Sequence, residues 1–157
     1  EFYGLSKHNK LKTDVLGDKN NYYINHLEQL KQIVPKAKYI FIVRDPRDVY
    51  CSYKGIAKLN SDSAYLPDLP RSLDNFVISW KKNQTQIIEF IKELNRSNYH
   101  ILNYEDLVSD TEFELKKICR FLGVNFTDEM LSYYAKNDEP QGLIDWKKKT
   151  LKPPDVL

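Results

Sequence analysis

Arg44 stands where a positively charged side chain could hold a phosphate group. It follows the apolar run 38–43 and precedes a helix start at Asp45, so we expect it between a buried strand and a helix. In open parallel sheets, ligands bind beyond the carboxyl ends of the strands, where the next helix also presents backbone N–H donors. A planar guanidinium suits a phosphate, and Ser52, roughly two helical turns further on, could add a hydroxyl donor. An ion pair between Arg44 and Asp48 is the structural alternative, and spacing alone does not separate the two.

Two short apolar runs are predicted to be strands. Residues 38–43 are almost continuously apolar, as expected of a strand buried on both faces of a parallel sheet, and residues 100–103 resume strand character. Between them, residues 73–94 place apolar side chains at helical spacing, which predicts a long amphipathic helix. Because this connection is a crossover and not a tight turn, we expect the strands to be parallel neighbours or near neighbours.

Helix signals surround the two strands. Apolar spacing predicts a helix over residues 25–34 that ends before Pro35, and two prolines mark residues 60–71 as a loop. This order of elements indicates an α/β fold in which helices cover part of a parallel sheet. Such sheets normally have more than two strands, so we expect further strands outside this sequence. Caps and stop signals predict two more helices, one that follows Ser109 or Asp110 and ends at Gly123, and one that begins at Thr127.

Composition and charge fit one globular domain without a nucleic-acid-binding surface. The 157 residues are 41% apolar and carry a net charge of only +2, which predicts a chain that folds but has no strong overall field. No run approaches the roughly 18 apolar residues of a membrane span, and no residue cluster calls for a metal. Residues 1–4 have neither an initiator Met nor a signal-peptide pattern. We therefore expect residues 1–157 to form a single, incomplete domain.

Residues 39–53, YIFIVRDPRDVYCSY, resemble the segment of PAPS-dependent sulfotransferases that binds the 3′-phosphate of the donor, 3′-phosphoadenosine 5′-phosphosulfate. The resemblance is closest to the carbohydrate and tyrosylprotein branches and covers roughly residues 17–149. It implies the P-loop-NTPase-like sulfotransferase fold. Further segments agree in order and separation, namely GDKN at 17–20, PKAK at 35–38, NYEDL at 103–107 and GLIDWK at 142–147.

The resemblance implies roles for five residues. Arg44 and Ser52 would bind the 3′-phosphate of PAPS. Tyr104 would lie near the adenine, unless its ring serves only core packing. Lys19 would meet the transferring sulfuryl group, where a point cation suits developing charge, unless it is an ordinary surface lysine. Trp146 would cover the nucleotide or seal the core.

Parts of the family pattern are absent. No Pro-Lys-Ser-Gly-Thr-like loop precedes residue 39, so the 5′-phosphosulfate site is missing and we expect the chain alone to be inactive. The Arg-Lys-Gly triplet that often adds phosphate contacts is also absent. Asn20 follows Lys19 where the cytosolic branch continues toward a histidine, so no catalytic base is identified, and His8 and His26 are weak candidates.

These residues predict a sulfotransferase that transfers a sulfuryl group from PAPS to an acceptor hydroxyl or amine and releases PAP. The alternative is a noncatalytic nucleotide-binding or interaction module with the same fold. A P-loop kinase is disfavoured because no Walker loop is visible. The acceptor, whether carbohydrate, protein or small molecule, has no simple motif. A cytoplasmic location is expected, with a Golgi lumenal enzyme separated from its anchor as the alternative.

Overall fold

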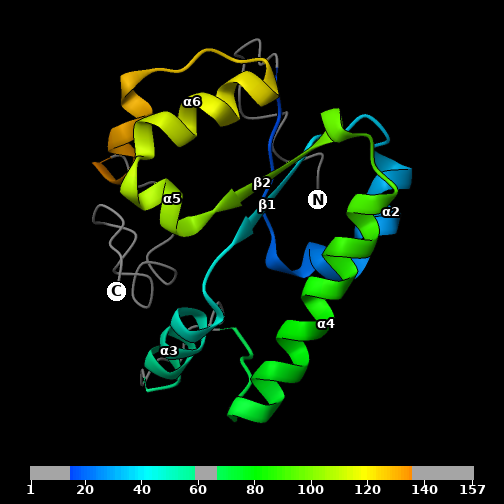
Figure 1. Ribbon diagram of the computed structural model, residues 1–157, viewed down its shortest axis with the longest axis vertical. Helices are drawn as coiled ribbons and strands as arrows, with labels where there is room; N and C mark the ends of the chain where they lie inside the picture. The colour runs from blue at the N-terminus through cyan, green and yellow to red at the C-terminus, as the bar shows by residue number, and fades with distance from the viewer. Residues whose placement is uncertain (1–14, 59–66, 136–157) are drawn as a thin grey trace, which may run out of the picture.

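A parallel pair of strands lies at the centre of the chain (Figure 1). The computed structural model describes residues 15–58 and 67–135. Within them, β1 (Tyr39–Val43) pairs in parallel with β2 (Tyr99–Asn103), with Tyr39 opposite Tyr99 and Val43 opposite Asn103. The prediction that the two apolar runs are parallel neighbours is confirmed, and so is the α/β fold class.

The helices agree with most of the sequence signals. The helix expected over residues 25–34 begins as a 3-10 turn, and a short helix that was not predicted follows β2 directly. The helix expected from Thr127 is a 3-10 segment with a kink at Ser132. In chain order the helices are η1 (Asn21–His26), α2 (Leu27–Ile33), α3 (Pro46–Ala57), α4 (Leu73–Lys92), η2 (Arg96–Asn98), α5 (Tyr104–Ser109), α6 (Thr111–Leu122) and η3 (Asp128–Ala135).

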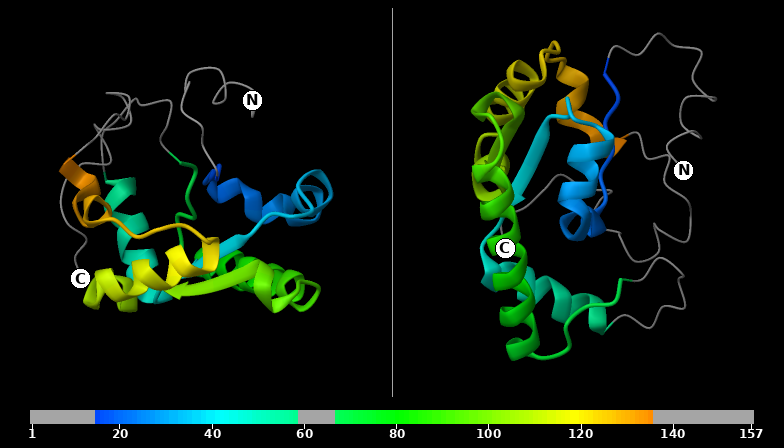
Figure 2. Two further views of the ribbon diagram at one scale, coloured as in Figure 1. Left: turned by 90° about the horizontal axis from the view of Figure 1, so that it is seen from above. Right: turned by 90° about the vertical axis from the view of Figure 1, so that its right-hand side faces the viewer.

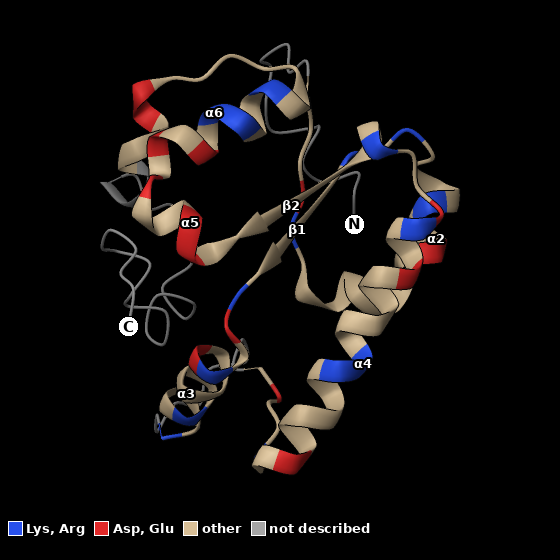
Figure 3. Ribbon diagram, viewed as in Figure 1, with Lys and Arg blue, Asp and Glu red and all other residues tan. Residues whose placement is uncertain are grey.

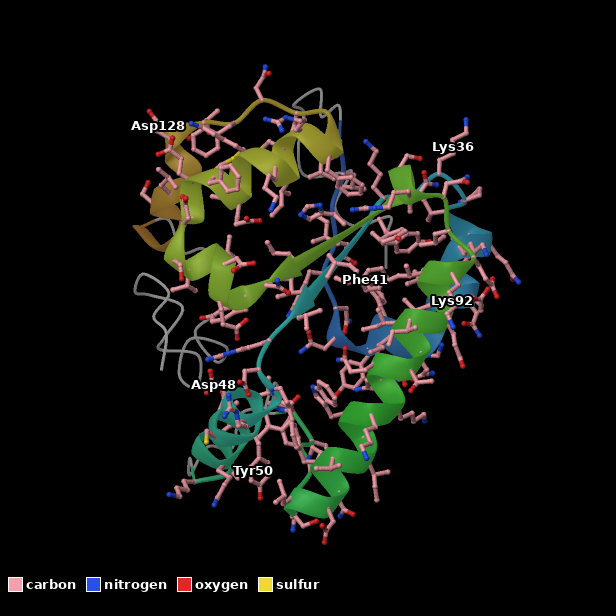
Figure 4. The ribbon with its side chains drawn as sticks, viewed as in Figure 1. Lys36, Phe41, Asp48, Tyr50, Lys92 and Asp128 are labelled. Carbon is pink, nitrogen blue, oxygen red and sulfur yellow. The ribbon has the colours of Figure 1, made fainter. Side chains whose placement is uncertain are left out.

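Helices cover both faces of the strand pair. Figures 1 and 2 show α5 and α6 on one side of the sheet and α2 and α4 on the other. On the α4 side, Tyr39 and Phe41 of β1 place their rings 5.1 Å and 6.4 Å from the ring of Phe90, which is 3% exposed. Phe41 points from β1 toward α4 (Figure 4). These edge-to-face contacts anchor β1 to the long helix.

The α6 side is built on β2. Leu102 is 2% exposed, and His100 lies with its ring 5.5 Å from that of Phe121 on α6. The prediction that both strands are buried on both faces is only partly right, because Ile40 and Ile42 of β1 are 38% and 59% exposed. The reason is that α5 and α6 contact β2 and leave this face of β1 open in the described part of the chain.

Helix α3 is held beyond the carboxyl end of β1 by aromatic packing. Tyr50 and Tyr53 place their rings 5.1 Å and 5.7 Å from the ring of Phe76, a buried residue near the start of α4. Asp45 caps the first turn of α3, as predicted from the sequence. The start of α3 is thereby fixed where β1 ends.

Gly123 ends α6 in a left-handed conformation, as its position in the sequence predicts. Its φ is +80°, and its N–H donates to the carbonyl of Cys119 at 2.8 Å. A Cβ at this position would meet no atom within 4 Å. A side chain would therefore meet backbone strain there and not a steric clash.

We expect Gly123→Ala to lower the free energy of unfolding by about 1 to 2 kcal/mol, the usual cost of a left-handed alanine. Gly55→Ala is the matched control, because Gly55 lies in α3 with open space around it. That substitution should raise stability by roughly 0.5 to 1 kcal/mol. Urea unfolding of both variants measures the difference, and equal effects would contradict the assignment.

The buried position of His100 predicts that the fold is sensitive to mild acid. Burial lowers the pKa of His100, Lys117 and Arg96 lower it further, and Glu114 opposes the change. The Nε2 atom is buried without a hydrogen-bond partner. The unfolded chain then binds more protons than the folded chain just below the ordinary histidine pKa of about 6.5. Stability contributed by the neutral ring is therefore present at higher pH and lost as the pH falls.

We expect the melting temperature to fall between about pH 7.5 and about pH 5.5, and this fall to be smaller in His100→Phe. Phenylalanine keeps a ring against Phe121 but cannot be protonated. His26→Gln, at an exposed position on η1, should retain the full pH dependence. Thermal unfolding at several pH values tests this, and an unchanged slope in His100→Phe would exclude His100 as its source.

Candidate anion-binding site

Arg44 and Tyr104 meet where the two strands end. Each is the first residue after its strand, and parallel pairing brings both carboxyl ends to the same edge of the sheet (Figure 1). The central carbon of the Arg44 guanidinium lies 4.3 Å from the centre of the Tyr104 ring. A cation over an aromatic face at this distance is held electrostatically as well as by packing. The structure thus brings together two of the five site residues proposed from the sequence.

The guanidinium of Arg44 has a hydrogen-bond donor that is not used within the described structure. Its Nε atom is buried without a hydrogen-bond partner, although the side chain as a whole is half-buried. The Arg44–Asp48 ion pair considered as the structural alternative is not found among the described residues. A buried donor without a partner is costly, and an anion is the ligand that would satisfy it. This atom fits a phosphate group.

Asp45 already occupies the start of α3. Its carboxylate accepts a hydrogen bond from the Arg47 N–H at 2.8 Å and forms an ion pair with the Arg47 guanidinium at 2.6 Å. These bonds, with the Arg47 side chain first, lower the pKa of Asp45 to about 2. One backbone donor of this helix start, the Arg47 N–H, is therefore already bonded to a side chain of the same loop, and the expectation that the terminus offers donors to a ligand stays a prediction.

Acidic residues begin the helix on the other side of the site. The first turn of α5 contains Glu105 and Asp106, and Figure 3 shows the acidic start of this helix near the end of β2. The Oε1 atom of Glu105 accepts a hydrogen bond from the backbone N–H of Asp45 at 2.9 Å. The sequence pattern does not single out Glu105. An acidic first turn is an ordinary helix signal and does not reveal a partner far away in the chain.

Ser52 lies half-buried in α3, four residues after Asp48, which Figure 4 labels near the start of this helix. Positions four apart share one face of a helix. Ser52 is therefore on the side of α3 that carries Asp48, and its role toward a phosphate stays a prediction.

Lys19 lies on a separate, exposed segment before η1. Asp18 organises this segment: it accepts a hydrogen bond from the Lys19 N–H at 2.8 Å and another from the Tyr23 hydroxyl. The hydrogen bond to Asp18 raises the pKa of Tyr23. Of the remaining candidates, His26 is exposed on η1, whereas Trp146 and His8 lie outside the described residues. The role of Lys19 in chemistry stays a prediction.

The described residues contain neither a metal-binding cluster nor a membrane-spanning helix. Residues 15–58 and 67–135 contain no group of three or more His, Cys, Asp or Glu side chains arranged to hold a metal ion. None of the helices within these ranges has the length and apolarity needed to cross a membrane.

Comparison with known proteins identifies the class that this fold and site define. The model of a sulfotransferase family matches residues 2–128, which is most of the chain. The chain therefore belongs to the sulfotransferase family, as the resemblance of residues 39–53 predicted.

Individual relatives agree with the family assignment. Sulfotransferase 2B1 of Mus musculus is 33% identical over 104 residues, which are 62% of this chain and 30% of the relative. Sulfotransferase 2A1 of Macaca fascicularis is 31% identical over 120 residues, 71% of this chain and 40% of the relative. The chain thus spans less than half the length of these relatives. Their names do not indicate the carbohydrate or tyrosylprotein branches, so the closeness to those branches stays a prediction.

A solved structure supports the fold. The sulfotransferase domain from the curacin biosynthetic pathway superposes with a TM-score of 0.66 and 25% sequence identity. The match covers 87% of this chain and 48% of that domain. This agreement confirms the predicted sulfotransferase fold for the part of the domain that the chain contains.

Proposed function

We propose that this chain provides the 3′-phosphate half of the donor site of a sulfotransferase. The protein would transfer a sulfuryl group from PAPS to an acceptor hydroxyl or amine and release PAP. The observation that carries the proposal is the guanidinium of Arg44, stacked on Tyr104 with a buried Nε that lacks a partner, at the carboxyl edge of the sheet. Because the chain belongs to the sulfotransferase family, we interpret this local geometry as part of the site for the sulfuryl donor.

The residues at the strand ends suit a nucleotide with a phosphate on its ribose. Arg44 would donate to the 3′-phosphate, and the Ser52 hydroxyl would add a second donor. Tyr104 would lie near the adenine while its ring also holds Arg44 in place. Arg47, by contrast, is engaged with Asp45 and its side chain is 87% exposed, so it is not assigned to the ligand.

PAPS, when bound, supplies an activated sulfuryl group whose bond to the phosphate oxygen breaks as a bond to the acceptor oxygen or nitrogen forms. The acceptor gives up its proton to a base that we do not assign. Within this chain, Lys19 would stabilise the charge that grows on the leaving phosphate oxygen. Arg44 and Ser52 would bind a part of the donor that does not react, and so orient it.

The second candidate function is a nucleotide-binding module without catalytic activity. Both functions require PAP to bind at Arg44, so binding alone does not separate them. A measurement of sulfuryl transfer, and of its dependence on Lys19, separates the two functions. The acceptor class and a cytoplasmic location remain predictions from the sequence.

We expect Arg44→Ala to weaken binding of adenosine 3′,5′-bisphosphate by about 1.5 to 3 kcal/mol, the usual range for a hydrogen bond to a charged group. Ser52→Ala should cost less. Arg47→Ala is the matched control, since this neighbouring arginine pairs with Asp45 and should leave affinity nearly unchanged. Isothermal titration calorimetry on this chain measures all three. The proposal fails if the unaltered chain does not bind, or if Arg44→Ala binds as well as Arg47→Ala.

We expect Lys19→Ala, in a sulfate-transferring protein that contains this chain, to lower kcat roughly a hundredfold, the scale of losing one preorganised donor. PAPS affinity should change little, because the interaction grows in the transition state. Lys36→Ala, on the exposed turn before β1 (Figure 4), is the control and should retain full activity. Steady-state rates with radiolabelled donor decide the question, and a Lys19 variant with most of its kcat would remove Lys19 from the chemistry.

A further inference from the structure

The pairing of the strands continues beyond their ends through side chains. Val43 lies opposite Asn103 in the sheet, sixty residues apart. The next pair, Arg44 and Tyr104, keeps the same separation and is joined by the ring contact at 4.3 Å. The pair after that, Asp45 and Glu105, keeps it again through the hydrogen bond from the Asp45 N–H to Glu105 Oε1 at 2.9 Å. We call the Arg44–Tyr104 and Asp45–Glu105 pairs the strand-end contacts.

Glu105 holds the loop that carries Arg44. Its carboxylate is partly buried and accepts a hydrogen bond from the backbone N–H of Asp45, one residue after Arg44. Tyr104, the residue before Glu105, supports the guanidinium itself. With both contacts in place, neither the backbone nor the side chain of Arg44 is free to swing away from the sheet edge. A hydrogen bond to a charged acceptor is among the stronger ones available for this purpose.

The negative charge of Glu105 allows two possible roles of this residue to be distinguished. A carboxylate next to an anion site repels the anion, so Glu105 opposes phosphate binding through its charge alone. Asp45 and Asp106 add two more acidic groups at the same edge. If Glu105 acted only through charge, its removal would tighten binding. If it acts by holding the loop, its removal would weaken binding, and the two roles differ in sign.

We propose that Glu105 is a positioning residue for the 3′-phosphate site, acting on Arg44 through the Asp45 N–H. This inference rests on the proposed function, because it assumes that Arg44 receives the phosphate. Glu105 itself touches no ligand. Its contribution requires an acceptor atom at Oε1 and does not require a negative charge, so glutamine can replace it and leucine cannot.

The test measures binding of adenosine 3′,5′-bisphosphate and of 5′-AMP, which lacks the 3′-phosphate, to this chain by calorimetry. We expect Glu105→Leu to weaken the bisphosphate roughly tenfold or more, the lower end of the range for a charged hydrogen bond. Glu105→Gln should stay within about threefold of the unaltered chain, and Asp106→Asn, which removes a neighbouring charge, should not weaken binding. Affinity for 5′-AMP should be the same in all of them.

Combining substitutions separates positioning from general destabilisation. In an Arg44→Ala background, Glu105→Leu should cause no further loss of bisphosphate affinity, because its effect passes through Arg44. Loss of fold stability alone would lower affinity for both ligands and in both backgrounds. Melting temperatures of each variant, measured with and without ligand, identify that case, which would overturn the inference.

The result also distinguishes the two proposals. If the unaltered chain binds the bisphosphate and Arg44→Ala weakens it, but Glu105→Leu binds equally or more tightly, only the role of Glu105 is wrong. If the unaltered chain does not bind the bisphosphate at all, the proposed function fails and the inference falls with it.

Discussion

The constant separation of sixty residues between β1 and β2 is the constraint on which the rest of the site depends. Parallel pairing of Val43 with Asn103 brings two carboxyl ends to one edge, and only a parallel register does so. The connection between them must then cross the sheet, which α3 and α4 accomplish. Aromatic packing of α3 on α4 and of β1 on Phe90 keeps that crossover tight. The first residues beyond the strands, Arg44 and Tyr104, meet as a consequence.

If this site binds an anion as proposed, a side chain would be its main donor, because the Arg47 N–H at the start of α3 is already bonded to Asp45. Many phosphate sites use the N–H groups at the start of a helix. In α3 the Arg47 N–H donates to Asp45, and the Arg47 side chain lowers the pKa of this carboxyl to about 2. This carboxylate lies at the positive end of the helix and offsets part of its charge. A guanidinium that lacks a protein partner at Nε becomes the donor left for a ligand.

Much of this arrangement could be predicted from local sequence, and the rest depends on distant contacts. The apolar runs predict β1 and β2, and the signals at Asp45 and Gly123 predict the start of α3 and the end of α6. Helix α5 was missed because its six residues are too short to show a period. Exposure of Ile42 was missed because a pattern of apolar residues does not report what covers them. Glu105 was missed because its partner lies sixty residues away.

Because the contacting residues are sixty positions apart, no short segment of the chain contains both partners of either strand-end contact. Closing so long a loop is entropically costly, and the strand-end contacts exist only after it has closed. Partial unfolding of either strand would separate Arg44 from Tyr104 completely and would not leave a weaker version of their contact. If the chain binds the nucleotide as proposed, ligand affinity and global stability would therefore be coupled. A nucleotide that binds across the strand ends would hold the two halves of the sequence together noncovalently and so stabilise the folded chain.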